Sequence, residues 1–168
     1  MEIQEVNHNL KKTRDELQGI LKGLNRNQLY TKKDLDSWSI GQICQHLIKT
    51  EELFVVAIRK GLKSKEDSLI EKKPLEFLLD RSKKIVAPYI AKPTDEILEY
   101  NEIIEKLNNS REKLNEILNT IEDPSVLSRR HFIHPVFKEM LLIDWVKTLY
   151  LHEQRHIKQI SEIKEGLK

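Results

Sequence analysis

Apolar residues recur at helical spacing along four long segments of the chain, at about residues 3–24, 39–61, 95–121 and 138–164. Within each segment they return every three or four positions, which places them on one face of a helix. A helix of this length cannot bury such a face alone, so the four are expected to pack side by side with their apolar faces inward. The pattern predicts an all-α protein built as a four-helix bundle.

Several residues predict where the helices begin and end. Ser39 is followed three residues later by Gln42, which fits a capping box that satisfies free amides of a first helical turn. Gly61 is expected just after the C-terminus of the same helix. Thr94 is a favourable N-cap for the third long helix, whose apolar face would begin with Ile97.

The periodicity weakens between residues 62 and 93. Pro74 can open a short helix that runs through Lys84, since proline is tolerated in a first turn. Pro88 and Pro93 then require extended or irregular backbone. No repeat or second unit is evident, so we expect residues 1–168 to form a single domain.

Composition narrows the class of protein. The chain has 168 residues, of which 39% are hydrophobic and 33% charged, with 5 Gly and 5 Pro. These values exclude a collagen-like chain and disfavour an intrinsically disordered chain. The longest apolar run, from Leu53 to Ile58, is too short to cross a bilayer, so no membrane partner is expected. The net charge is +2, and the basic pairs are dispersed along the chain and mostly lie beside acids, so no nucleic-acid partner is expected either.

The single cysteine, Cys44, excludes an internal disulfide and favours a reducing compartment. The first residues, MEIQEVNHNLKK, carry acids where a secretory signal needs a basic start and an apolar run. We therefore expect a cytoplasmic protein. Apolar positions on the outer flanks of the bundle are compatible with a homodimer.

Two histidines lie on the apolar face of the last helix. His152 and His156 are one turn apart, on the same face as Leu149 and Ile160. A buried imidazole needs a hydrogen bond or a metal, and two at this spacing can present nitrogens to one transition-metal ion. The alternative interpretation is a pair of hydrogen-bonded core residues.

The string from His152 to His156 matches H-E-x-x-H, in which a metalloprotease binds zinc with both histidines and uses the glutamate as general base. A protease is disfavoured because the chain after His156 is too short for the helix that supplies a further glutamate. A third ligand from upstream fits better, and His46, on the flank of the second helix, is the candidate.

The sequence resembles the DinB-like (YfiT-like) superfamily. The resemblance rests on two groups of residues in matching order: the run from Trp38 to Leu47 with Glu51, and the group His134 to Phe137, Asp144-Trp145, His152 to His156 and Gln159-Ile160. It implies a four-helix bundle with one long crossover and a divalent metal held by His46, His152 and His156. Related proteins include thiol-dependent S-transferases, such as bacillithiol transferases, and mycothiol-dependent maleylpyruvate isomerases.

Three neutral imidazoles would leave one coordination position of the metal open, as in catalytic zinc sites. A bound water could then ionise near a pKa of roughly 7, or a thiol could be held as thiolate. We expect zinc, with nickel or iron as alternatives, and a small-molecule substrate that includes a low-molecular-weight thiol.

Glu153 is the candidate general base or ligand-orienting partner, and Gln42 and Thr148 are candidate acceptors for the ligand histidines.

Other polar residues in the motifs receive structural roles. His134 is expected to fix its loop by a hydrogen bond, and Cys44 to pack in the core. Nothing in the sequence explains Glu51, which lies within an apolar stripe. The competing hypothesis for the whole protein is a non-catalytic bundle in which the metal joins helices and the protein acts as a binding or structural module.

Overall fold

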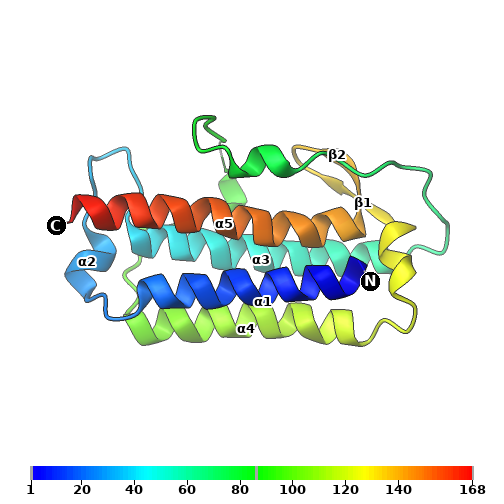
Figure 1. The fold of residues 1–168 in the computed structure, drawn as a ribbon, viewed down its shortest axis with the longest axis horizontal. Helices are drawn as coiled ribbons and strands as arrows, with labels where there is room; N and C mark the ends of the chain where they lie inside the picture. Colours follow the sequence, from blue (N-terminus) through cyan, green and yellow to red (C-terminus); the bar gives the residue numbers. More distant parts are fainter. Residues whose placement is uncertain (1, 86, 168) are drawn as a thin grey trace.

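The computed structural model describes residues 2–85 and 87–167, and its main feature is a bundle of four long helices lying side by side (Figure 1). These helices are α1 (Glu2–Leu21), α3 (Ile40–Leu62), α4 (Tyr100–Asn119) and α5 (Leu142–Gly166). The predicted all-α four-helix bundle is confirmed. None of the described helices is long and apolar enough to cross a membrane.

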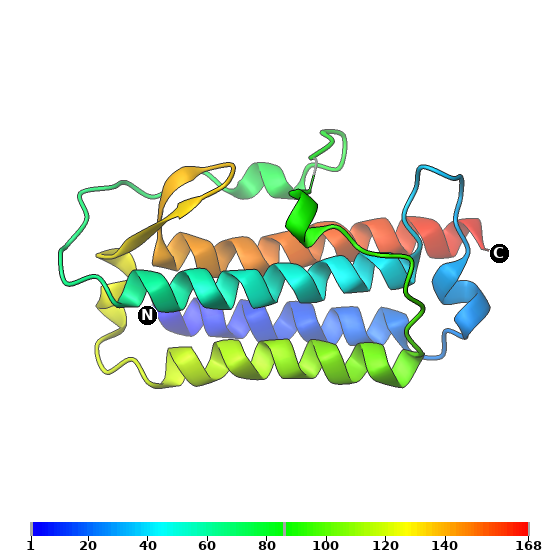
Figure 2. The same ribbon diagram turned by 180° about the vertical axis from the view of Figure 1, so that it is seen from behind.

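The direction of the helices follows from their cross-contacts. Arg14 of α1 reaches the carbonyl of Leu107, whereas Arg111 reaches that of Leu10, so α1 and α4 are antiparallel. The contacts of His46 with His156 and of Phe54 with Trp145 show that α3 and α5 are antiparallel. The helices α3 and α4 are parallel, so the connecting segment 63–99 must return along the bundle, as Figure 2 shows. This segment is the long crossover that the resemblance implied.

The cap predicted at Ser39 is confirmed, because its side chain accepts from Gln42 N and Gln42 Oε1 accepts from Ser39 N. The helix ends near Gly61 as predicted, but the position predicted for Gly61 itself, just outside the helix, is wrong, since α3 continues to Leu62 and is capped by Lys63. The start predicted at Thr94 is also wrong, because α4 begins at Tyr100. The Thr94 hydroxyl instead accepts from Glu96 N and fixes a local turn ahead of the helix.

The last helix begins later than the sequence predicted. Residues Lys138–Leu141 form strand β2, which pairs antiparallel with β1 (His131–His134), and α5 starts at Leu142. Because residues 138–141 also fit the helical period, the sequence placed the start of this helix too early. A four-residue strand is too short to show an alternating pattern of its own.

The remaining short elements lie in the connections. The predicted helix from Pro74 to Lys84 is reduced to the 3₁₀ turn η1 (Glu76–Leu79). A five-residue helix that the sequence did not predict, α2 (Arg26–Tyr30), begins with a capping box between Asn25 and Gln28. The other two 3₁₀ turns are η2 (Tyr89–Ala91) and η3 (Pro124–Ser128).

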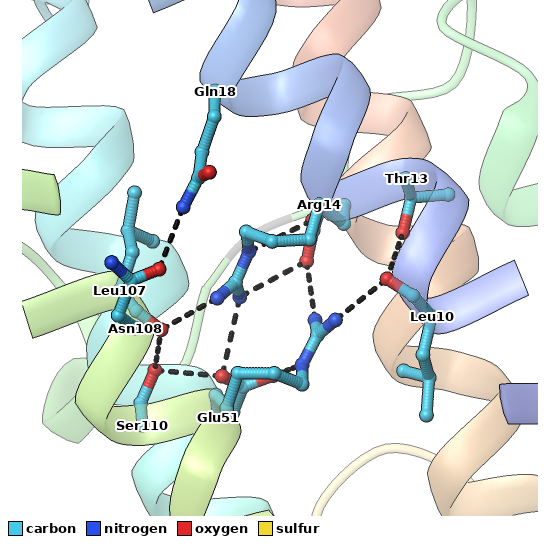
Figure 3. A network of polar contacts seen from close by, with 10 residues as sticks. Leu10, Thr13, Arg14, Gln18, Glu51, Leu107, Asn108 and Ser110 are labelled. Carbon is cyan, nitrogen blue, oxygen red and sulfur yellow. Dashed lines mark hydrogen bonds and ion pairs between the residues drawn. The ribbon is translucent and has the colours of Figure 1, made fainter.

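A layer of charged side chains divides the hydrophobic core into two clusters. Arg14, Glu51, Arg111 and Glu153 come from α1, α3, α4 and α5 respectively, and all four are buried. On each helix the residues of one apolar cluster precede the charged residue and those of the other cluster follow it. Figure 3 shows part of this layer, which we call the charged layer.

Gly61 permits a close approach between α3 and the start of α5. A Cβ at this position would collide with the side chain of Leu142 and lie 3.2 Å from the carbonyl oxygen of His131. Leu142 is fully buried, so it cannot move aside without disturbing the core. The glycine is therefore retained inside a helix despite its poor helix propensity.

We predict that Gly61→Ala destabilises the protein by about 1–3 kcal/mol, because overpacking outweighs the gain in helix propensity. Gly19→Ala in α1 is the matched control, since a Cβ there meets no atom within 4 Å. This control should stabilise the fold by roughly 0.5–1 kcal/mol. Urea unfolding measures both changes, and equal stabilisation by the two substitutions would contradict the prediction.

A second prediction concerns the pH dependence of stability. Burial by itself would raise the pKa of Glu51, but the charges of Arg111 and Arg14 and the hydrogen bonds from Ser110 and Arg111 hold that pKa below its ordinary value of 4.5. A carboxyl with a lowered pKa stabilises the fold fully above its unfolded pKa and loses this effect as the pH falls through the folded pKa. Glu51→Gln should therefore cost on the order of 3 kcal/mol at neutral pH, and less as the pH falls below 4.5.

Urea unfolding of both proteins across this pH range measures the difference. Glu52→Gln is the control, because Glu52 is an exposed neighbour on the same helix. A difference between Glu51→Gln and the unsubstituted protein that stays constant at acid pH would refute the assignment.

Candidate metal centre

Three histidine side chains converge between α3 and α5. His46 comes from α3, and His152 and His156 come from consecutive turns of α5. The Nε2 atom of His152 lies 3.0 Å from Nε2 of His46 and 3.1 Å from Nε2 of His156. One nitrogen of each ring lies within 4.8 Å of the others, which is a spacing that can hold a metal ion. The structure therefore brings together the three histidines that the sequence singled out.

Two of the three nitrogen–nitrogen distances are close to those around a tetrahedral ion. With metal–nitrogen bonds of about 2.0–2.1 Å at tetrahedral angles, the ligand nitrogens lie about 3.3–3.4 Å apart. The two Nε2 separations at His152 are within a few tenths of an ångström of that value. Small movements of the rings would thus suffice to accommodate a cation.

Hydrogen bonds on the opposite side of two rings fix their tautomers. His46 Nδ1 donates to the carbonyl oxygen of Ala91 at 2.8 Å, and His156 Nδ1 donates to Gln159 Oε1 at 2.7 Å. A neutral imidazole with its proton on Nδ1 has a lone pair on Nε2. His152 Nε2 faces both lone pairs and can donate to no more than one of them, whereas a cation would satisfy all three nitrogens. The donor set therefore fits a metal.

The electrostatic environment keeps these rings neutral. Burial lowers the pKa of His46 and, with the neighbouring imidazoles, lowers the pKa of His152 well below the usual value. Burial and His46 together lower the pKa of His156 to about 3. Neutral imidazole is the form that binds a metal, so no proton has to be displaced near neutral pH.

The cluster is largely enclosed. His46 and His156 are 4% and 8% exposed, whereas His152 is partly exposed. The ring of Trp38 lies 5.0 Å from that of His46 and covers it from the start of α3. Solvent or a ligand would accordingly approach the cluster on the side of His152.

The crossover is attached to both helices that carry the histidines. The buried guanidinium of Arg155, next to His156, donates to the carbonyl oxygens of Leu78, Asp80 and Lys83. Farther along the crossover, Ala91 O accepts from His46. Figure 2 shows this segment passing over α3 and α5. The crossover thus fixes the orientation of one histidine of the cluster and lies over the helix pair.

Glu153 has a different environment from the one expected of a general base. Its carboxylate accepts from Arg14 and Arg111 in the charged layer, and the residue is 3% exposed. Both carboxylate oxygens are engaged by guanidinium groups. The expected general-base role stays a prediction, and the contacts assign this side chain to the bundle core.

The acceptors expected for the ligand histidines are replaced by others. Gln42 is engaged in the cap of α3, and the Thr148 hydroxyl donates to the carbonyl of Asp144. Ala91 O and Gln159 Oε1 serve His46 and His156 instead. Gln159 lies one turn after His156, so helical spacing could have identified it. Ala91 could not be found from sequence, because a backbone carbonyl leaves no residue pattern.

The roles expected for His134 and Cys44 are confirmed. His134 Nδ1 accepts from the backbone amides of Val136 and Phe137 and so fixes the hairpin turn. Cys44 is fully buried, and burial raises the pKa of its thiol to about 12. A thiol in this state packs as a small apolar group and is not a nucleophile.

The charged layer explains Glu51, for which the sequence gave no reason. Glu51 accepts from Arg14, Arg111 and Ser110. Arg14 and Arg111 also lie between apolar stripe positions of their own helices. A charged residue on the apolar face of each long helix was the signal that could have predicted this layer.

Together the fold and the site define an all-α bundle with three convergent imidazoles on an antiparallel helix pair. The chain belongs to the DinB superfamily, whose family model matches residues 9–160. The resemblance inferred from the motifs is thereby confirmed.

Similar proteins agree with this assignment. The uncharacterized protein YuaE of Bacillus subtilis (strain 168) is 31% identical over 147 residues, which cover 88% of this chain and 90% of that protein. The crystal structure of TT2238, a four-helix bundle protein, matches with a TM-score of 0.62 and 18% identity, covering 95% of this chain and 98% of that one. At this identity the structural match concerns the fold alone.

The contacts of Arg155 generate a prediction about the crossover. Arg155→Met would remove the side-chain donor shared by the carbonyl groups of Leu78, Asp80 and Lys83, and we expect a loss of about 1–3 kcal/mol in the local stability of residues 75–84. Hydrogen exchange in this segment should accelerate while the four long helices remain protected. Arg59→Met, at an exposed position of α3, is the control, and equal exchange in both variants would count against the assignment.

Proposed function

We propose that this protein binds one divalent transition-metal ion through His46, His152 and His156 and is a metal-dependent enzyme acting on a small molecule. The observation that carries the proposal is the convergence of three imidazole nitrogens, two of which have their lone pairs fixed inward by hydrogen bonds at Nδ1. Membership of the DinB superfamily supports it.

The bound metal would supply a Lewis acid with an open position, at which a small thiol or a water molecule ionises near neutral pH. The chain contributes the remaining requirements. Ala91 O and Gln159 Oε1 orient two ligands, Trp38 restricts solvent beside His46, and the partly exposed His152 marks the side of approach. The reaction proposed is thiol transfer to, or hydrolysis of, a small electrophilic molecule.

Three neutral nitrogen ligands suit zinc, nickel and iron. Zinc is proposed first, because a three-histidine tetrahedral site with one open position is a common catalytic zinc geometry. Glu153 receives no proton-transfer role in this proposal, since its carboxylate is occupied by Arg14 and Arg111.

The alternative function is a non-catalytic bundle in which the metal joins α3 to α5. The burial of His46 and His156 favours this alternative, because structural metal sites are closed. Metal binding alone does not separate the two functions, and activity must be measured together with stability.

The first experiment measures metal binding. Metal-free protein is titrated with Zn²⁺ in competition with a chromogenic chelator, and we expect one equivalent to bind. His46→Ala, His152→Ala and His156→Ala should each weaken binding by at least about tenfold. His8→Ala, at an exposed position of α1, is the control and should bind as the unsubstituted protein does. Absence of stoichiometric zinc, nickel and iron binding would refute the proposal.

The second experiment separates catalysis from a structural role. The metal-loaded protein and His152→Ala are compared for melting temperature and for turnover of low-molecular-weight thiols with chromogenic electrophiles. Loss of turnover with little change in melting temperature supports the enzyme. A large fall in melting temperature, with no turnover in either protein, supports the structural alternative.

A further inference from the structure

The charged layer crosses the bundle beside the histidine cluster. It has two guanidinium and two carboxylate groups and is therefore formally neutral. Glu153 directly follows His152 on α5, and Glu51 lies five residues after His46 on α3. The same two helices thus carry both the charged layer and the three imidazoles.

The carboxylates are each bound by both arginines. Glu51 Oε1 accepts from Arg14 Nη2 at 3.2 Å and from the Ser110 hydroxyl at 2.6 Å, and its Oε2 accepts from Arg111 Nε at 2.9 Å. Glu153 Oε1 accepts from Arg14 Nε at 3.2 Å, and its Oε2 accepts from Arg111 Nη2 at 2.8 Å. Neither arginine is dedicated to one acid, so all four helices are joined in one network.

Each arginine also binds the backbone of an opposite helix. Arg14 Nη1 donates to Leu107 O of α4 at 2.5 Å, and Arg111 Nη1 donates to Leu10 O of α1 at 2.6 Å (Figure 3). These contacts are reciprocal and specify one axial position of α1 against α4. The guanidinium groups then hold both acids at that same level.

Such a network accepts a single register of the helices. Apolar side chains can pack in several registers, because dispersion and burial are not directional. A shift of one helix by a turn, about 5.4 Å, would remove a charge from its partners and leave it buried without compensation. The relative position of α3 and α5 is therefore more tightly specified by the charged layer than by the apolar clusters.

We propose that Arg14, Glu51, Arg111 and Glu153 are positioning residues that set the register of α5 against α3 and so hold the three Nε2 atoms at metal-binding distances. This inference rests on the proposed function, because its consequence is the geometry of the metal site. The ring of His46 now lies 4.9 Å from each of the rings of His152 and His156. A slip by one turn would leave His46 beside only one of these two histidines, so the three imidazoles would no longer converge.

The test replaces the layer by apolar residues without leaving an unpaired charge. A fourfold variant carries Arg14→Met, Glu51→Leu, Arg111→Met and Glu153→Leu. It is expected to remain folded, since an apolar layer of similar volume can be as stable as a buried ion network. We expect its Zn²⁺ affinity to fall about tenfold or more, and the visible spectrum of its Co²⁺ form to lose the tetrahedral signature of the unsubstituted protein. Unchanged affinity and an unchanged spectrum would overturn the inference.

The matched control is Leu114→Ala, a cavity substitution on α4 close to Arg111 and fully buried. It should lower the melting temperature while leaving the Zn²⁺ affinity and the Co²⁺ spectrum of the folded protein unchanged.

If the fourfold variant fails to fold, Arg111→Lys serves instead, because a point charge cannot replace the forked contacts to two acids and Leu10 O. Arg111→Lys should weaken Zn²⁺ binding more than Leu114→Ala at a similar melting temperature, and the opposite order overturns the inference.

A measurement without metal keeps this inference separable from the proposed function. Spin labels at the exposed positions Glu52→Cys on α3 and Ser161→Cys on α5 report the axial position of the two helices. The distance distribution should be narrow with the charged layer intact and broadened or shifted in the fourfold variant. A narrow and unchanged distribution overturns the register role even if the unsubstituted protein binds no metal.

Discussion

Charge neutralisation inside the bundle is the constraint on which the rest of the structure depends. Two arginines and two glutamates are buried at one level, and each of the four long helices supplies one of them. An unpaired buried charge of this kind costs about 3–5 kcal/mol, which is a large share of the stability of a domain. The apolar clusters on either side provide most of the favourable free energy, whereas the charged layer restricts how the helices align.

The histidine cluster uses this alignment. Two of its histidines come from one helix, where the one-turn spacing is guaranteed by helix geometry, and the third comes from an antiparallel neighbour. The crossover adds what the helices do not supply, since Ala91 O fixes the tautomer of His46 and Arg155 attaches the segment to α5. Thus the irregular connection between parallel helices contributes directly to the site.

Family membership and site geometry answer different questions. The match to the DinB superfamily and the similarity to YuaE establish what kind of chain this is. The proposed chemistry depends on the three imidazoles, their neutral state and the partly exposed edge at His152. A neutral nitrogen donor set is suited to activating a thiol or water molecule, and the same donors can equally join two helices.

The sequence by itself determined the helical bundle and the histidine pair of the last helix, because the 3.6-residue period and the i, i+4 spacing of His152 and His156 are local properties of a helix. The position of His46 on the flank of the second helix made it the candidate third histidine, and the motif resemblance supported that choice and added the crossover. Only the tertiary structure decided the hairpin at residues 131–141, the carbonyl of Ala91 beside His46, and the burial of Glu51 and Glu153 against arginines from other helices. These features depend on residues distant in the chain, and a side chain's charge does not reveal whether its partner is water or a guanidinium on a neighbouring helix.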